Sequence, residues 1–311
     1  MDEIDRRLSR IRFLALALAV LSLLIVLVSA YIRLRGAGLG CTPWPECYGQ
    51  ILGSGPYPQS GGARILHRIV ASLALVLGFV LVWQCLRPAA IDGPRRPATV
   101  LLALMILLTI VGVFSADPHR VWASTINILG GAGLVLLSWR TVLAAGPAVP
   151  APASRRAAPL LHAGLGLLGL TLLLGALIGA RYAAPACPSL PGCGDVSWPA
   201  GGWAALNPVA TIAAPAMLGD AGGAALHLLH RWAALATVAL LAIAGLQSLL
   251  RPGARAPAAV MLALLLIQAA LGILTVVSGF GLSFAVAHSV GAAALLATSL
   301  HLLLRVRRLP A

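Results

Sequence analysis

Residues 13–32 read FLALALAVLSLLIVLVSAYI, a run of 20 residues without a charged side chain. Because a bilayer offers the backbone no hydrogen bonds, a run of about this length crosses the hydrocarbon core as a helix. Similar runs recur along the 311-residue chain. The eight membrane spans that we predict are Phe13–Ile32, Ile65–Leu86, Ala98–Ser115, Val121–Trp139, Pro159–Ala180, Gly223–Leu250, Ala258–Val277 and Phe284–Leu304.

The composition excludes a water-soluble globule. Hydrophobic residues make up 60% of the chain and charged residues only 10%, whereas soluble domains contain about 25% charged residues. The net charge is +14, and all 22 basic residues are arginines. Most of them lie in loops between the apolar runs, so we read the charge as a sign of membrane topology and predict no nucleic-acid partner.

The arginines also predict the orientation in the membrane. With a cytoplasmic N-terminus, 15 of the 22 arginines fall on the cytoplasmic side, as the positive-inside rule requires. We therefore predict a multi-pass protein of the cell membrane with both termini in the cytoplasm. The cytoplasmic arginines are Arg6, Arg7, Arg10, Arg12, Arg87, Arg95, Arg96, Arg140, Arg155, Arg156, Arg251, Arg255, Arg305, Arg307 and Arg308.

The chain contains an internal repeat. The sequence CTPWPEC at 41–47 returns as CPSLPGC at 187–193, and ILHR at 65–68 returns as LLHR at 228–231. Four crossings return the chain to the side where it started, so the two copies have the same orientation. We predict an all-α polytopic membrane protein of eight transmembrane helices, arranged as two tandem four-helix bundles that are related by a pseudo-twofold axis along the membrane normal.

The repeat divides the chain into domains. We predict an N-terminal half at 1–143, a cytoplasmic linker rich in Ala and Pro at 144–158, and a C-terminal half at 159–311.

Four of the five cysteines form two close pairs, Cys41 with Cys47 and Cys187 with Cys193. The predicted topology places both pairs outside the cytoplasm, where disulfides persist. We predict a disulfide in each loop, which is either redox-active or a structural staple. Zinc is the weaker alternative, since neither loop supplies a set of four ligands.

Two histidines, His230 and His288, lie at similar depth inside predicted helices of the second half. An imidazole inside the bilayer is costly unless it has a partner. Two facing imidazoles suit the axial positions of a haem iron, and a structural hydrogen-bonded pair is the alternative. In the first half, His67 corresponds to His230 but Asn127 stands in place of His288. His67 therefore either holds a haem alone or forms hydrogen bonds as a remnant of the duplication.

Four arginines occupy matching positions in the two halves. Arg68 and Arg231 directly follow the histidines, and Arg35 and Arg181 precede the cysteine pairs. Each of them either binds a haem propionate or extends to the lipid headgroups.

The stretch RLRGAGLGCTPWPEC at 33–47, the two His-Arg dipeptides and the duplicated layout together resemble the haem A synthase family of cytochrome oxidase assembly proteins. The resemblance implies an enzyme that oxidises a methyl group of haem O to the formyl group of haem A by successive hydroxylations, with haem b as cofactor. The family binds haem b at the positions of His230 and His288. The implied partners are the haem substrate, the lipid bilayer, and haem O synthase or oxidase assembly factors.

The first half departs from the family pattern, which has Glu-x-x-His-Arg on the second helix and His on the fourth. Here the Glu position is Arg64, the first His is retained as His67, the candidate catalytic residue, and the second His position is Asn127. A carboxylate could accept a proton, whereas Arg64 reverses the charge. Two hypotheses therefore stand: a divergent haem A synthase, or a haem b-binding protein without synthase activity that serves electron transfer or haem handling. The oligomeric state, monomer or homo-oligomer, stays open.

Overall fold

The computed structural model describes residues 3–39, 41, 44–52, 61–115, 117–147, 157–193, 202–216 and 219–307. Within these ranges the chain is all helical, without a β-strand and with one isolated bridge between Arg120 and Thr211. The long helices are α1 (Glu3–Gly36), α2 (Gly61–Leu86), α3 (Asp92–Phe114), α4 (Val121–Ala144), α5 (Ala157–Ala180), α6 (Ala221–Leu249), α7 (Arg255–Val277) and α8 (Leu282–Arg307). Three short 3-10 helices lie in the loops: η1 (Gln50–Leu52), η2 (Ala184–Ala186) and η3 (Gly202–Leu206).

All eight long helices are long and apolar enough to cross a membrane, which confirms the predicted fold class and the number of spans within the described residues. Several helices extend beyond the predicted spans. Helix α1 begins at Glu3, because the acidic and arginine-rich segment before Phe13 favours helix, and Glu3 and Asp5 suit a helix N-terminus. Helix α3 begins at Asp92 and contains Pro97 near its start, where few backbone hydrogen bonds are lost.

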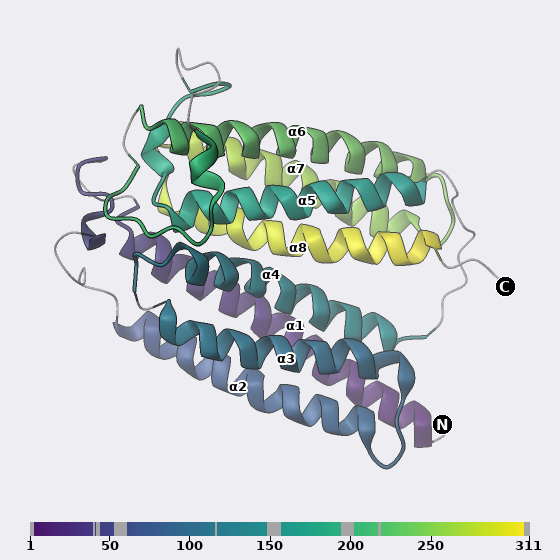
Figure 1. Cartoon of the computed structure of the whole chain (residues 1–311). Coiled ribbons are helices and arrows are strands. Elements are labelled where there is room, and N and C mark those ends of the chain that lie inside the picture. The colour runs from purple at the N-terminus through teal and green to yellow at the C-terminus, as the bar shows by residue number, and fades with distance from the viewer. Residues whose placement is uncertain are drawn as a thin grey trace.

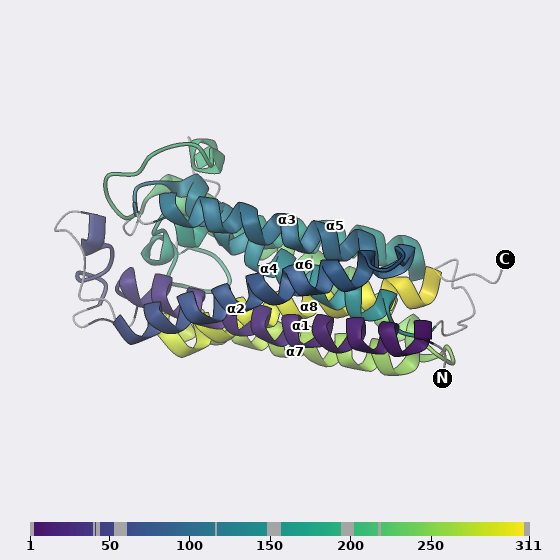
Figure 2. The same ribbon diagram turned by 90° about the horizontal axis from the view of Figure 1, so that it is seen from below.

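The helices form two groups that lie side by side (Figure 1). In the first group, α1 and α3 each pack against both α2 and α4; in the second, α5 and α7 each pack against both α6 and α8. The groups meet where α8 packs against α1 and α4, and where α4 packs against α5. Helix α1 starts and α8 ends at one end of the molecule, and the loops that follow α1 and α5 lie at the opposite end (Figures 1 and 2).

Each group has its own apolar core, and small residues line the interface between the groups. Leu18, Leu81 and Leu101 are fully buried in the first group. Between the groups, Ala132 of α4 packs with Ala293 and Ala297 of α8, which lets the helix backbones approach closely. The domain boundaries and the twofold relation stay predictions. Of the predicted linker, residues 148–156 lie outside the described residues.

The outward faces of the helices are apolar as well. Val113, Leu235 and Leu266 are 74%, 61% and 72% exposed. Water would penalise such side chains, whereas lipid acyl chains solvate them, so the exposed surface is suited to a bilayer. The molecule is therefore a multi-pass membrane protein.

The close packing of α5 against α6 predicts an effect of adding one methyl group. A Cβ at Gly164 would lie 2.6 Å from Cδ2 of Leu241, which is fully buried. We expect Gly164→Ala to lower the free energy of unfolding by about 1–3 kcal/mol through overpacking. Gly166→Ala is the matched control, since a Cβ there meets nothing within 4 Å. Equal thermal unfolding midpoints for the two variants in detergent would contradict the packing.

Candidate functional site

The structure brings His230 and His288 together across the second group. Helices α6 and α8 each pack against both α5 and α7, so they occupy diagonal positions. His230 extends from α6 and His288 from α8, and their ring centroids lie 6.4 Å apart with an angle of 73° between the ring planes. Both side chains are half-buried.

A backbone carbonyl fixes the orientation of the His230 ring. Its Nδ1 lies 3.0 Å from the carbonyl oxygen of Thr171 on α5. Because a carbonyl only accepts, Nδ1 carries the proton and donates it, and Nε2 is left with a free lone pair. Metal-binding histidines typically hold their second ring nitrogen in this way. Sequence reasoning missed this partner, because a backbone carbonyl has no sequence signal.

Gln268 of α7 holds His288. Its amide Nε2 lies 3.1 Å from Nδ1 of the His288 ring and donates to the His288 backbone carbonyl at 3.0 Å. The Oε1 atom of the same amide is buried and has no hydrogen-bond partner among the described residues. The amide therefore places an unused acceptor beside His288. Sequence analysis overlooked Gln268, although an amide side chain within the apolar run of α7 was a usable signal.

The residues around the pair fit an iron porphyrin. Since bonds between a metal and an imidazole nitrogen are about 2 Å long, two imidazoles on opposite sides of one metal ion have ring centroids about 6 Å apart. Glycines lie beside both rings: a Cβ at Gly175 would be 3.2 Å from Cε1 of His230, and one at Gly272 would be 3.1 Å from Cε1 of His288. Gly175 of α5 and Gly272 of α7 thus let the imidazoles lie directly against the flanking helices, while Gln268 contacts the His288 ring.

The first group repeats the diagonal arrangement with different residues. Helices α2 and α4 each pack against both α1 and α3. Helix α2 carries His67, and α4 carries Asn127; both side chains are half-buried. Arg64 and Arg68, near the start of α2, are exposed. The assignment of His67 as a haem ligand or catalytic residue stays a prediction.

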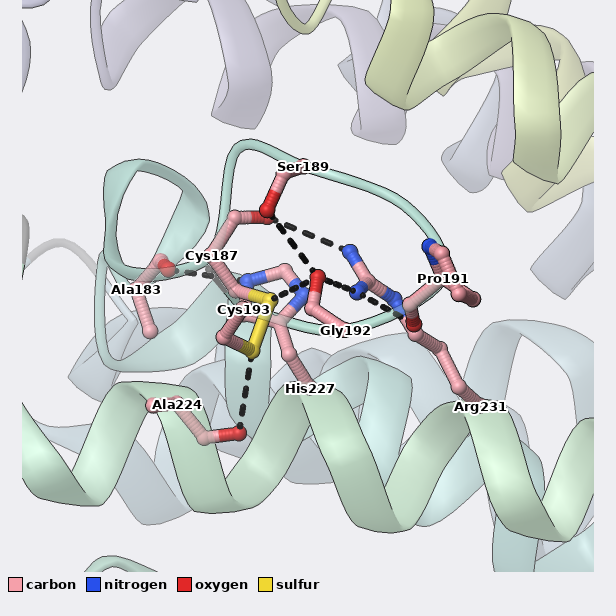
Figure 3. The surroundings of a disulfide bond; sticks show 9 residues. All are labelled: Ala183, Cys187, Ser189, Pro191, Gly192, Cys193, Ala224, His227 and Arg231. Atoms are coloured by element: carbon pink, nitrogen blue, oxygen red, sulfur yellow. Dashed lines mark hydrogen bonds between the residues drawn. A yellow bond between two sulfur atoms is a disulfide. The ribbon is translucent and has the colours of Figure 1, made fainter. Parts of the chain in front are cut away.

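Arg231 is bound to the loop between Cys187 and Cys193 (Figure 3). Its guanidinium donates to three backbone oxygens: Gly192 at 2.8 Å, Pro191 at 3.1 Å and Cys187 at 3.2 Å. His227, one turn before His230, donates from Nε2 to the carbonyl of Ala183 at 2.9 Å. Helix α6 therefore holds this loop through Arg231 and the segment before the loop through His227. Binding of a haem propionate by Arg231 stays a prediction.

The other two predicted arginines differ in their surroundings. Arg35 is exposed. Arg181 donates to the backbone oxygen of Asn207 at 3.3 Å. Burial lowers the pKa of Arg181, and the negative charge of Asp220 partly opposes this shift. Binding of propionates by these two arginines likewise stays a prediction.

Both predicted disulfides are confirmed. Cys41 bonds to Cys47 and Cys187 to Cys193, while Cys85 is a free, buried thiol. A redox role for either disulfide stays a prediction.

Aromatic rings connect the first cysteine loop, which runs from Cys41 to Leu52, to the second half. The ring of Trp44 lies 5.2 Å from that of Tyr48 and 5.9 Å from that of Phe280, and Tyr48 lies 6.2 Å from Tyr182. The Phe280 ring in turn lies 6.1 Å from His227. Burial raises the pKa of Tyr182 to about 12, so its phenol stays neutral. The loop therefore packs beside the helix that carries His230.

The fold and site define a multi-pass helical membrane protein in which each half pairs a disulfide loop with a His-Arg helix. A family model described as cytochrome oxidase assembly protein matches residues 12–55 and 118–300. The chain belongs to this family. Residues 56–117, which contain α2 and α3 with Arg64 and His67, lie between the matched segments.

The chain is also similar to curated proteins named Heme A synthase. The protein of Shewanella oneidensis is 28% identical over 309 residues, which cover 90% of this chain and 91% of that protein. The protein of Rhizorhabdus wittichii is 28% identical over 323 residues, covering 92% and 90%. That of Symbiobacterium thermophilum is 42% identical over 88 residues, covering 28% of each chain.

The contacts of Arg231 predict a difference between the two halves. We expect Arg231→Gln to lower the free energy of unfolding by about 2 kcal/mol, because hydrogen bonds to a charged group contribute roughly 1.5–3 kcal/mol. Arg68→Gln is the matched control, since Arg68 follows the corresponding histidine and is exposed. Thermal unfolding in detergent measures both; an equally small loss in the two variants would be inconsistent with the described loop contacts.

Proposed function

We propose that this protein is an oxidoreductase of the haem A synthase type, which converts a methyl group of haem O into the formyl group of haem A during cytochrome oxidase biogenesis. The observation that carries the proposal is the facing pair of His230 and His288 in a chain of this family. Full-length similarity to proteins named Heme A synthase supports it.

His230 and His288 would hold haem b as the resident cofactor. When bound, this group supplies one-electron redox chemistry. The protein contributes the orientation of the ligands: the Thr171 carbonyl holds Nδ1 of His230, which directs Nε2 away from α5, and Gln268 restrains His288. The disulfide loop held by Arg231 lies over the same helix. Together these contacts fix both imidazoles before a cofactor arrives.

The substrate haem would lie in the first half, with His67 as the protein ligand between α2 and α4. When water supplies the oxygen atom, conversion of methyl to formyl releases four electrons, which an external oxidant must take up, and four protons, which need an acceptor at the site. Arg64 cannot accept them. A neutral His67 that binds the iron through its one lone-pair nitrogen has no second basic nitrogen, so the protons would pass to water. Arg68 and Arg35, both exposed near the same end of the first half, would attract the propionates.

The same proposal includes the topology and the partners. Both termini lie in the cytoplasm of the cell membrane and both disulfide loops lie outside, in agreement with the arginine distribution and with the oxidised cysteines. Haem O synthase or an oxidase assembly factor would supply the substrate or receive the product.

A specific observation also favours the second candidate, a haem b-binding protein without synthase activity. Arg64 and Asn127 replace the family's Glu and second His, and residues 56–117 lie outside the segments that the family model matches. Under this hypothesis the second half keeps its haem for electron transfer or haem handling, and the first half does no chemistry.

The His pair is tested by two substitutions. We expect His230→Ala and His288→Ala each to abolish the low-spin haem signal in the reduced-minus-oxidised spectrum, because each removes one axial ligand. His162→Gln is the control, since His162 bonds only within its own helix, to the Ala158 carbonyl. An unchanged spectrum in both alanine variants would refute the assignment.

Synthase activity is tested by haem extraction and mass analysis. Purified protein from cells that make haem O should contain or produce hydroxylated or formyl haem, and His67→Ala should reduce this product at least tenfold while the second-half haem stays. If abundant protein yields only haem B and haem O, the second candidate replaces the first.

A further inference from the structure

A cavity of about 170 Å³ lies between the two groups of helices, at the end of the molecule where α1 starts and α8 ends. Helix α1 contributes Arg12 to its wall, α4 contributes Trp139, and α8 contributes His301 and Arg305. The candidate haem site is distinct from this cavity, because its His288 lies near the opposite end of α8 from His301 and Arg305.

The cavity is cationic. Arg12 and Arg305 bring two guanidinium groups to it, and none of the described residues that line it is acidic. Nε of Arg305 donates to Nε2 of His301 at 3.1 Å, which holds the Arg305 head beside another residue of the cavity wall. Two like charges in one cavity repel each other unless an anion lies between them. The charge distribution therefore favours an anionic ligand.

The wall of the cavity also contains a neutral donor that has no partner. The indole ring of Trp139 lies 5.8 Å from the His301 ring, and its Nε1 is buried without a hydrogen-bond partner among the described residues. A buried N–H without an acceptor costs about 1–3 kcal/mol. An oxygen atom of a bound anion would supply that acceptor.

The rest of the cavity wall is apolar. It consists of Val142, Leu143, Gly146, Pro147 and Leu304, and Trp139 itself packs into the apolar interface with Val135 and Ala297. A ligand for such a cavity combines an anionic head with an apolar tail. Basic pockets between transmembrane helices bind the headgroups of acidic lipids for this reason.

We propose that this cavity binds the phosphate group of an anionic phospholipid. Arg12 and Arg305 neutralise the phosphate, and Trp139 donates its indole N–H to a phosphate oxygen. Because Arg12 and Trp139 belong to the first group of helices and Arg305 to the second, the bound headgroup connects the two groups. The proposal does not depend on haem binding or on synthase activity.

The test uses the purified full-length protein with phosphatidylglycerol or phosphatidylcholine in detergent. Native mass spectrometry should show phosphatidylglycerol retained and phosphatidylcholine lost, and phosphatidylglycerol should raise the thermal unfolding midpoint. A basic residue near an anionic lipid surface strengthens binding roughly fivefold, so Arg12→Gln/Arg305→Gln should weaken retention by about 25-fold. The control with equal charge is Arg6→Gln/Arg307→Gln, whose arginines lie on the same two helices but are not among the residues that line the cavity.

One further variant and one further ligand complete the test. Trp139→Phe keeps the ring but removes the donor, and should weaken retention severalfold even if the double variant does not fold. Equal retention by Arg12→Gln/Arg305→Gln and its control, or by Trp139→Phe and the unmodified protein, would overturn the proposal.

Inorganic phosphate without lipid is the second source of the same chemistry. A rise of the unfolding midpoint with phosphate alone that equals the rise with phosphatidylglycerol would show that a soluble phosphate, and not a lipid, is the ligand.

Discussion

The whole structure depends on one constraint: a polar group inside an apolar helical bundle must find its partner within the protein. The backbone meets this requirement by forming eight helices. The side chains meet it through contacts between helices. His230 bonds to a carbonyl of α5, His227 to a carbonyl of the loop that follows α5, and His288 is held by Gln268 of α7. Each partner fixes a ring in space, so the same requirement that satisfies a buried imidazole also prepares it as a ligand.

The sequence predicted more of the fold than of the candidate site. Apolar run length predicts the spans, because the hydrocarbon thickness sets a minimum helix length and little else. It does not predict where α1 begins, since Glu3–Arg12 favours helix without lying in the apolar run. The proximity of His230 and His288 was predictable from their matching depths. Thr171 was not, because any residue can offer a carbonyl, and the register of α5 against α6 decides which one does.

The two halves of the molecule are unequal. Arg231 secures the Cys187–Cys193 loop with three hydrogen bonds, whereas Arg68, its counterpart, is exposed. A guanidinium that donates to three backbone carbonyls stabilises the protein itself. An exposed guanidinium is available to bind a ligand reversibly. This difference agrees with a resident cofactor in the second half and an exchanging substrate in the first. The sequence alone could not reveal it, because both residues stand in the same His-Arg dipeptide.

The first cysteine loop strengthens this asymmetry. Its described residues pack mainly against the second half: Tyr48 faces Tyr182, Trp44 faces Phe280, and Gly49 closely approaches Pro215. Gly49 has a φ of +74°, and a Cβ there would lie 2.7 Å from the Pro215 ring, so the approach depends on glycine. The guanidinium of Arg33, at the end of α1, lies against Gly179 of α5 and beside Tyr48 and Tyr182. These contacts join residues of both halves at the end that carries the histidine pair. A shift of one half against the other would therefore disturb the packing of the loop near His227, which lies on the same helix as His230. The histidine site is thus stabilised by both halves, although both of its proposed ligands come from one.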